Sequence, residues 1–331
     1  MACQSTGWNN YNPKSIHTPT SIIYLHYSDS DLPPKPSDAW TRFVCISDTH
    51  SHTFNVPEGD VLLHSGDITN AGQFEEFDRT ITWLAGLKHQ KKIIIGGNHD
   101  LPLHNGWYQQ HFEEPEDDRI SIMDLLTGDR ALQAGIIYLC DEKVQFRLKD
   151  GGREWSVYGS PWSPEFGTWA FGYPRSLGSI LYSKFPQADI LLTHTPAQGI
   201  FDRTNDSELV GCCDLRAHLL RERPILHVAG HIHEGRGAYV HDWDVSAEPV
   251  VQNDNEDLSD NSEDDDGNDK DKLAIYNDTE APQEIIGKDG HRRTTFINAS
   301  TMPSGRYTWL DKKLLCGGDP GWQAIVVDVL D

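Results

Sequence analysis

The stretch KKIIIGGNHD, residues 91 to 100, joins an apolar run directly to a polar cluster. Its three isoleucines are typical of a buried strand, since short β-branched runs bounded by glycine favour strands. Two glycines follow them, and the next three positions are Asn98, His99 and Asp100. A polar turn is the simplest interpretation of one such junction, because Gly and Asn are common turn residues. A functional interpretation requires the same pattern elsewhere in the chain.

The same kind of junction recurs on both sides of this stretch. Apolar runs end in polar clusters at residues 42–50, 61–69, 190–196 and 225–233, and further strands are predicted at 294–300 and 324–330. Helical patterns separate several of these runs, at 73–88 and 214–223. The first of them places five apolar residues on one face: Phe74, Phe77, Ile81, Leu84 and Leu87. This alternation predicts a layered α/β domain with its site at the carboxyl ends of the strands.

Side chains that can bind a metal follow five of these strands. They are Asp48, His50, Asp67, Asn98, His194, His231 and His233. In D-x-H and H-x-H, two side chains of an extended segment lie on the same side, so we expect each pair to converge on one ion. Mixed carboxylate and imidazole donors suit divalent cations. The set exceeds what one open catalytic site uses, and a carboxylate can bridge two ions, so it favours two ions.

The ordered motifs SDTH, GDIT, GGNHD, THTP and GHIH resemble the five motifs of the calcineurin-like metallophosphoesterase superfamily, over residues 43 to about 300. The closing motifs HTP and GHIHEG are similar to those of the metallophosphoesterase domain-containing group, which is related to class III cyclic-nucleotide phosphodiesterases. The resemblance implies a four-layer αββα sandwich of two mixed sheets flanked by helices. It also implies a dinuclear metal site, with manganese as the expected metal and iron or zinc as alternatives.

Carried onto this chain, the resemblance implies two ligand sets that share Asp67. One metal would be held by Asp48, His50, Asp67 and His233, and the other by Asp67, Asn98, His194 and His231. A metal-bridging hydroxide would attack phosphorus in line, and His99 would act as the general acid on the leaving group. Asp100 is assigned the role of orienting His99. We expect the two glycines to let the backbone turn tightly enough to present both Asn98 and His99.

The expected substrate is a small phosphodiester, with cyclic nucleotides as one candidate. A phosphomonoesterase or protein phosphatase of the same superfamily is the alternative. Those enzymes carry a GDxxDRG motif, and the corresponding segment here, GDITNAG at residues 66–72, lacks its arginine. A catalytically weak scaffold is a third interpretation. The aromatic stretch 155–175 is interpreted either as a lid that stacks on the substrate or as packing. Arg175, Arg203 and Arg236 are weak candidates for a phosphate clamp.

One tract contributes −8 of the net charge of −23. Residues 252–272 contain ten acidic side chains and two lysines, and we expect a disordered acidic insertion there because so polar a segment cannot bury enough surface. A calcium loop is excluded, since Leu273 would occupy the twelfth position, which requires a carboxylate. The remaining charge disfavours a long nucleic acid as partner. The partner of the acidic insertion is left open.

The rest of the composition predicts an ordinary globular protein. Residues 1–40 are interpreted as a polar N-terminal extension and 41–331 as the metallophosphoesterase domain. No apolar run approaches the length of a membrane span, and no secretory signal is evident, so we expect a cytoplasmic or nuclear protein without a membrane partner. The six cysteines include no C-x-x-C pair, which favours reduced, mostly buried thiols.

Overall fold

The strand predicted from the isoleucine run, β5 (Lys91–Ile95), lies inside a seven-stranded sheet within the part of the chain that the structure describes. In spatial order the strands are β1 (Ser15–His17), β2 (Ser21–Tyr24), β17 (Ile325–Leu330), β3 (Trp40–Ile46), β4 (Val61–His64), β5 and β6 (Ile136–Leu139). Strands β3 to β6 are parallel, whereas β17 pairs with both β3 and β2 in the antiparallel sense. The first sheet is therefore mixed.

The structure is a computed structural model, and it describes residues 14–28, 32–112, 116–243, 292–302, 309–310, 313–314 and 323–331. The acidic tract 252–272, where a disordered insertion is expected, lies outside the described residues. Among the described residues, no helix has the length and hydropathy needed to cross a membrane.

A second sheet of six strands stacks on the first, again counting only the described residues. Its order is β13 (Gly237–Trp243), β14 (Arg292–Asn298), β12 (Leu226–Ala229), β11 (Ile190–Thr193), β8 (Glu154–Ser160) and β7 (Glu142–Arg147). The four inner strands are parallel and the two edge strands are antiparallel. Two small two-stranded pairs complete the described strands: β9 (Ser163–Pro164) with β10 (Gly172–Tyr173), and β15 (Trp309–Leu310) with β16 (Lys313–Leu314).

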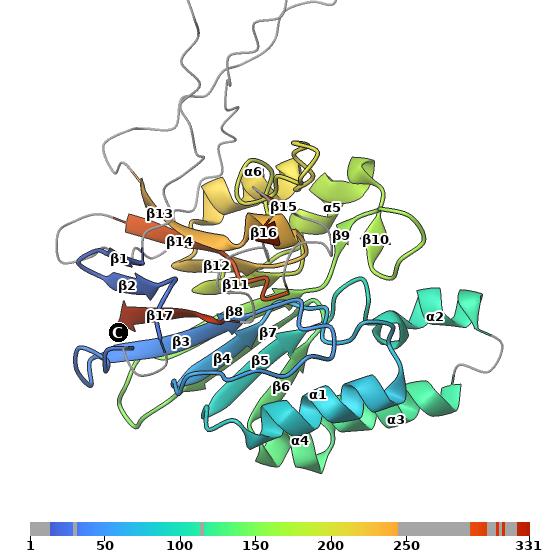
Figure 1. Cartoon of the computed structure of the whole chain (residues 1–331), viewed down its shortest axis with the longest axis horizontal. Coiled ribbons are helices and arrows are strands. Elements are labelled where there is room, and N and C mark those ends of the chain that lie inside the picture. The colour runs from blue at the N-terminus through green and yellow to red at the C-terminus, as the bar shows by residue number, and fades with distance from the viewer. Residues whose placement is uncertain are drawn as a thin grey trace, which may run out of the picture.

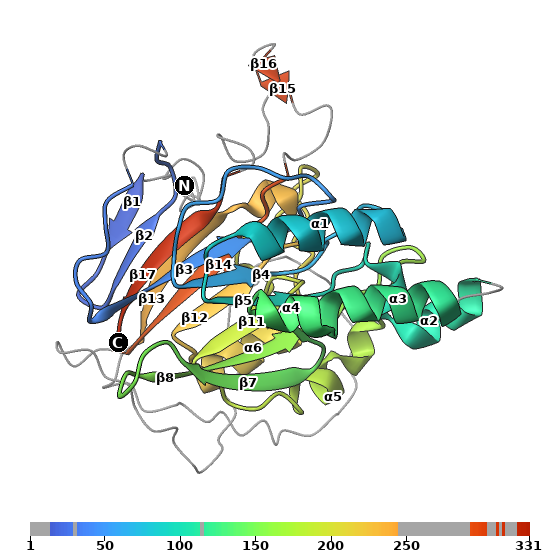
Figure 2. The ribbon, with the colours of Figure 1, turned by 90° about the horizontal axis from the view of Figure 1, so that it is seen from below.

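Helices cover the outer face of each sheet. The described helices are α1 (Phe74–Gly86), α2 (Asn105–His111), α3 (Glu116–Thr127), α4 (Asp129–Gln133), α5 (Gly178–Tyr182) and α6 (Cys213–Glu222). Figure 1 shows α5 and α6 above the second sheet and α1, α3 and α4 below the first. Figure 2, seen from below, shows α1, α3 and α4 lying across the strands of the first sheet. The predicted four-layer αββα sandwich is confirmed.

The position of β5 between two cores explains why the isoleucine run is apolar at consecutive positions. Ile93 and Ile95 belong to the core between the two sheets, whereas Ile94 belongs to the core between the first sheet and α1. All three are fully buried. Because side chains alternate across a strand, a sheet covered on both faces requires an apolar residue at every position.

Two expectations about segments are wrong. Residues 14–28 were assigned to a polar extension, but Ile22 to Tyr24 pair with β17, so this part of the lead belongs to the first sheet. In helix α1, Phe77, Ile81 and Leu84 are buried as predicted, but Phe74, at the first helical position, is exposed.

Candidate metal centre

The polar clusters that follow five parallel strands meet at one edge of the sandwich. Asp48, Asp67 and Asn98 follow β3, β4 and β5 of the first sheet, and His194 and His231 follow β11 and β12 of the second. Carboxyl ends of parallel strands share an edge, and the two sheets are stacked so that both edges face the same space. Side chains nearly two hundred positions apart in the chain are therefore neighbours.

The first group consists of Asp48, His50 and His233, whose donor atoms all lie within 4.8 Å of one another. His233 Nε2 is 3.3 Å from Asp48 Oδ1 and 3.4 Å from His50 Nε2. Asp48 is fully buried and accepts hydrogen bonds from the backbone N–H of His231 and from the hydroxyl of Ser300, at 3.0 and 2.8 Å. Its carboxylate is thus oriented from two other strand ends.

The second group consists of Asp67, His194 and His231, again within 4.8 Å of one another. His194 Nε2 is 3.5 Å from Asp67 Oδ1 and 2.9 Å from Asn98 Oδ1. His194 Nδ1 is 2.8 Å from the carbonyl oxygen of Ser65 and must donate to it, because a carbonyl can only accept. In the neutral imidazole this leaves a lone pair on Nε2, directed at two oxygens.

Asp67 lies between the two groups. Its Oδ2 is 3.7 Å from His50 Nε2, while its Oδ1 faces His194 and also accepts a hydrogen bond of 2.9 Å from the backbone N–H of His99. A third set, of His50, Asp67 and His99, meets the same 4.8 Å limit. All seven predicted metal-binding side chains, together with His99, are brought to this one edge.

The backbone here is left-handed rather than extended. Asp48, His50, Asp67 and His231 have φ angles of 54°, 42°, 51° and 68°. Such angles are uncommon for residues other than glycine and cost about 1–3 kcal/mol each. The strands end before these residues, at Ile46 in β3 and His64 in β4. The argument from an extended D-x-H segment was therefore wrong: the side chains converge because the chain turns.

Glycines permit the close approach of these loops. A Cβ atom on Gly97 would collide with Asp67 Oδ1 and lie 2.7 Å from His194 Cε1. On Gly96 it would lie 3.2 Å from Leu103 and 3.3 Å from Phe171. Neither glycine is among the described residues with a positive φ. The expectation that they are needed for a tight turn was therefore wrong. Their role is to leave room for neighbouring side chains.

The buried charges of the centre shift its pKa values in opposite directions. Burial would raise the pKa of Asp48, but the hydrogen bond and charge of His233 hold it well below its usual value. Burial lowers the pKa of His50, and burial with the neighbouring His194 lowers that of His231 to about 3. Burial also acts against protonated His233, yet its bond to Asp48 raises its pKa overall. His50 and His231 are therefore neutral at neutral pH, the form that binds metals.

These features fit a pair of divalent cations. Among the described residues, the ion-pair partners of Asp48 and Asp67 are histidines alone. Two buried carboxylates without lysine or arginine partners need another source of positive charge. His194 Nε2 faces oxygens of Asn98 and Asp67 at 2.9 and 3.5 Å, so these three donor atoms are close enough to share one cation. The donor set of carboxylate, amide oxygen and imidazole matches metals such as manganese, iron and zinc.

His99 lies at the rim of this centre, and its ring is held from three sides. Its Nδ1 donates to the carbonyl oxygen of Asn70 at 2.6 Å. Its ring meets that of His50 edge to face at 4.7 Å, and the ring of Trp169 lies 4.2 Å away at an interplanar angle of 30°. Orientation of the ring thus comes from Asn70 and from two neighbouring rings.

The assignment of Asp100 to His99 is wrong. Asp100 is fully buried and accepts hydrogen bonds from the backbone N–H groups of Ile68, Thr69 and Gly97, and from the hydroxyl of Thr69. It therefore ties the loop after β4 to the loop after β5. Burial and the nearby Asp67 raise the pKa of Asp100 to about 7.

The other candidates fall into different places. Arg175 donates to the carbonyls of Val210 and Gly211, Arg203 to that of Ser207, and Arg236 to those of Leu25 and Gln323. These contacts give each arginine a structural partner, which argues against the clamp. The aromatic stretch is divided: residues 155–160 belong to the buried strand β8, Phe171 is buried, and Trp169 lies beside His99.

Sequence reasoning missed two residues that support the centre. Ser300 donates to Asp48, and Asn298 donates to the carbonyl oxygen of Ile232 at 2.8 Å, which fixes the loop between His231 and His233. Both follow or end β14, which was interpreted only as a sheet strand. Their position at a strand end, as in the other five junctions, was the available signal.

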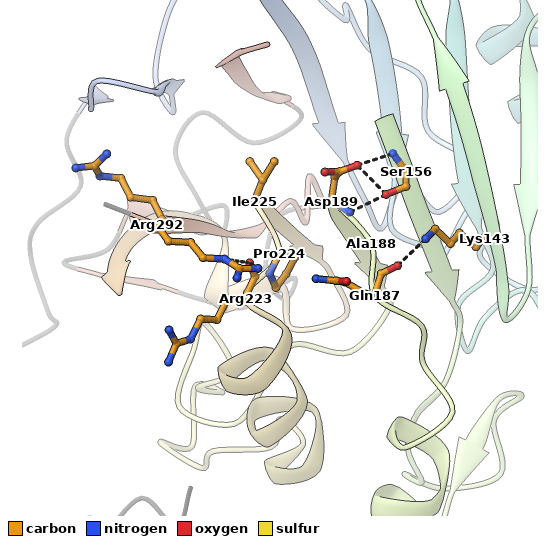
Figure 3. A pocket seen from close by; sticks show the side chains of 10 residues that line it. Lys143, Ser156, Gln187, Ala188, Asp189, Arg223, Pro224, Ile225 and Arg292 are labelled. Atoms are coloured by element: carbon orange, nitrogen blue, oxygen red, sulfur yellow. Dashed lines mark hydrogen bonds between the residues drawn. The ribbon is translucent and has the colours of Figure 1, made fainter. Parts of the chain in front are cut away.

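A pocket of about 350 Å³ lies at the other end of the second sheet, where β11, β12 and β14 begin. Figure 3 shows its lining, with Lys143 directed toward Gln187 and Asp189 bonded to Ser156. Arg292 donates to the carbonyls of Glu222 and Arg223, at the end of α6. The pocket is thus separate from the candidate metal centre.

Comparison with known proteins identifies relatives that match more than half of the chain. A metallophosphoesterase domain-containing protein 1 of Homo sapiens is 39% identical over 217 residues, which are 62% of this chain and 64% of that protein. A UPF0046 protein of Caenorhabditis elegans, T07D4.2, is 34% identical over 247 residues, which are 69% of this chain and 60% of that protein.

A third relative is named a probable rhamnogalacturonate lyase C, from Emericella nidulans. It is 35% identical over 245 residues, which are 73% of this chain but 22% of that protein. The chain thus spans less than two thirds of each of these three relatives. A family model described as "Calcineurin-like phosphoesterase" matches residues 41 to 235, the stretch from β3 through the last of the seven side chains predicted to bind metal. The chain therefore belongs to the calcineurin-like phosphoesterase family.

Proposed function

We propose that this protein is a metal-dependent phosphodiesterase that acts on small phosphate esters. The observation that carries the proposal is the convergence of two acid and histidine groups around Asp67, with His99 held beside them. Family membership supports a phosphoric ester hydrolase in general. The diester preference, the metal identity and the roles of the individual residues are the parts that we add.

We assign the residues to two cations that share Asp67. Asp48, His50 and His233 complete one set, and Asn98, His194 and His231 complete the other. Bound divalent cations at such a site lower the pKa of water and attract phosphoryl oxygens, so that hydrolysis can proceed near neutral pH. We take manganese as the native metal, with iron or zinc as alternatives, because all three accept mixed oxygen and nitrogen donors.

His99 serves as the proton donor to the leaving group. Its Nδ1 is engaged by the Asn70 carbonyl, so Nε2 is the atom that can carry a proton to a departing alkoxide. Hydrolysis of a diester requires this step, because an alkoxide departs slowly unless it receives a proton. The backbone N–H of His99 donates to Asp67, which keeps the ring next to the shared carboxylate.

The distribution of positive charge favours a diester over a monoester. A monoester dianion carries more negative charge than a diester, and protein phosphatases supply an arginine at the motif that reads GDITNAG here. Arg175, Arg203 and Arg236 donate to backbone carbonyls instead. Cyclic nucleotides are one candidate class of substrate. The net charge of −23 favours a small ester over a long nucleic acid.

The test compares bis-p-nitrophenyl phosphate with p-nitrophenyl phosphate in the presence of manganese. We expect the diester to be hydrolysed with the higher kcat/KM. The Asp67→Ala variant should lose both activity and metal, since it removes the shared carboxylate. A monoester preference would support the phosphatase alternative, and no turnover by metal-loaded protein would support a scaffold.

A further inference from the structure

Trp169 lies in a loop that is firmly anchored on both sides. Strands β9 and β10 close the base of the loop, with hydrogen bonds of 3.1 Å from Ser163 N–H to Phe171 O and 2.9 Å from Glu165 N–H to Tyr173 O. The two residues after Trp169, Ala170 and Phe171, are 0% and 2% exposed. The position of the indole is therefore set by the core of the protein.

The anchor connects this loop to the same motif that presents His99. Phe171 packs against Gly96, where an added Cβ would lie 3.3 Å from its ring, and its ring is 5.0 Å from that of His104. Both contacts belong to the segment that follows β5. Trp169 and His99 are thus held in a fixed relation by contacts that neither ring makes itself.

The indole of Trp169 contacts His99, and much of the side chain remains exposed. The indole lies 4.2 Å from the His99 ring, yet Trp169 remains 39% exposed. An indole has a large apolar surface that is normally buried. An exposed tryptophan at the rim of a reactive centre therefore has apolar surface available for a ligand. Because the ring adjoins the proton donor, the part of the substrate that it can reach is the leaving group.

We propose that Trp169 is a specificity-determining residue that stacks on the leaving group, so that the preferred substrates are esters whose leaving group carries a planar aromatic ring. This inference rests on the phosphoesterase function proposed above. Aromatic stacking of this kind contributes up to about tenfold in binding or rate. A tryptophan that served only to pack His99 would affect all leaving groups alike.

The first experiment varies the leaving group and keeps the rest of the ester constant. Methyl phenyl phosphate and methyl hexafluoroisopropyl phosphate release alcohols of similar acidity, of which only one is aromatic. We expect Trp169→Ala to lower kcat/KM for the phenyl ester about tenfold more than for the fluoroalkyl ester. Trp169→Phe should recover most of the difference. An equal loss with both esters would overturn the proposal while leaving the phosphodiesterase function intact.

A matched control comes from the same loop. Phe166 is 80% exposed, and Phe166→Ala removes an aromatic ring without touching the contact between Trp169 and His99. We expect this variant to keep the wild-type ratio of the two esters. A change in the ratio as large as that of Trp169→Ala would assign the effect to the loop in general and contradict the role of Trp169.

A binding experiment separates this inference from the proposed reaction. Phenylphosphonate and methylphosphonate differ by the aromatic ring and are not hydrolysed, and calorimetry with the manganese-loaded full chain measures both. We expect the wild type to bind phenylphosphonate more tightly, and Trp169→Ala to lose that preference. A wild type that turns over neither ester but shows this pattern would refute the diesterase and retain the stacking site. If the wild type and Trp169→Ala preferred phenylphosphonate to the same extent, the stacking site would be excluded.

Discussion

His99 is the residue whose role differs most sharply from those of its neighbours. Its Nδ1 is bonded to Asn70 and its ring lies against Trp169, so a smaller polar side chain can replace it without opening the buried centre. We expect His99→Asn to lower kcat by about 10²–10⁴-fold, the usual effect of losing general acid catalysis, with metal content unchanged. Steady-state kinetics and elemental analysis measure the two quantities. Metal loss in proportion to activity would instead make His99 a ligand.

A substitution at Gly97 can test how closely the loops of the centre pack. A Cβ at this position would collide with Asp67 Oδ1, so we expect Gly97→Ala to reduce metal content and turnover together. The control is Gly86→Ala in α1, where an added Cβ has nothing within 4 Å. Since alanine is the better helix former by about 0.5–1 kcal/mol, that variant should be neutral or more stable. Thermal unfolding and metal analysis distinguish the two. Wild-type metal content in Gly97→Ala would contradict the close approach.

The chemistry of the site could be predicted from residue types, but its backbone could not. Asp48, Asp67 and His231 were recognised because their side chains suit metals and follow apolar runs. Their positive φ angles have no sequence signal, since left-handed aspartate and histidine are maintained only by the surrounding structure. Asp100 illustrates the limit. A carboxylate next to His99 in sequence turned out to bind the backbone of the preceding motif loop.

At the level of elements, strand β17 joins the C-terminal part of the chain to the centre of the first sheet. Its Asp328 accepts two hydrogen bonds of 2.7 Å from Arg42 of β3, and both side chains are buried. Removing one partner of a buried pair leaves an uncompensated charge. We expect Asp328→Asn to lower the free energy of unfolding by about 3–5 kcal/mol. Urea denaturation measures this value.

The control for this pair lies on the surface. Lys88 and Glu58 form an ion pair of 2.6 Å, but their side chains are 78% and 74% exposed. Water screens such a pair, so Glu58→Gln should leave the urea midpoint unchanged. A similar loss in both variants would show that the β3–β17 pair is no more important than a surface contact.

Elements with a strong period were predictable, and short or context-dependent ones were not. The apolar stripe of α1 and the strands at 190–196 and 225–233 have clear patterns. Strands β1 and β2 were missed because they are three and four residues long and pair with β17 from the other end of the chain. Strand β8 was not predicted as a strand, because its Trp155 and Tyr158 belong to an aromatic stretch for which a lid and packing were both left open. Its pairing with β7 and β11 decides between them.

For the molecule as a whole, buried histidines outside the metal centre make stability depend on pH. His227 is 2% exposed, and its Nε2 lies 2.9 Å from the hydroxyl of Thr193, which itself donates to Thr195 O. Burial, with a smaller contribution from His218, lowers the pKa of His227 to about 3. The unfolded chain therefore binds the proton more tightly. Stability is complete above about pH 6.5 and falls as the pH decreases toward 3.

We expect His227→Gln to reduce this pH dependence, because glutamine can donate to Thr193 without titrating. Each such histidine contributes a slope of about 1 kcal/mol per pH unit between pH 6 and 4. Urea denaturation at several pH values, with a chelator present in all samples, measures the slopes. The chelator keeps metal release from contributing. Equal slopes in the wild type and the variant would exclude His227 as a source.

The ten acidic side chains of residues 252–272 raise the question of whether their charge affects the centre. At physiological ionic strength the Debye length is about 8 Å, so charges exposed to water act only over short distances. Replacing the ten acids of residues 252–272 by their amides should therefore change kcat/KM by less than about twofold at that ionic strength.

At low ionic strength, the same replacement should raise kcat/KM, because repulsion between the tract and an anionic diester is then less screened. Steady-state kinetics at two salt concentrations, with wild-type and amide-substituted full chains, give the comparison. Metal content serves as the control, since the tract supplies none of the residues assigned to the cations. A large change in kcat/KM that persists at physiological salt would contradict a purely screened effect and indicate that the tract acts directly on the centre.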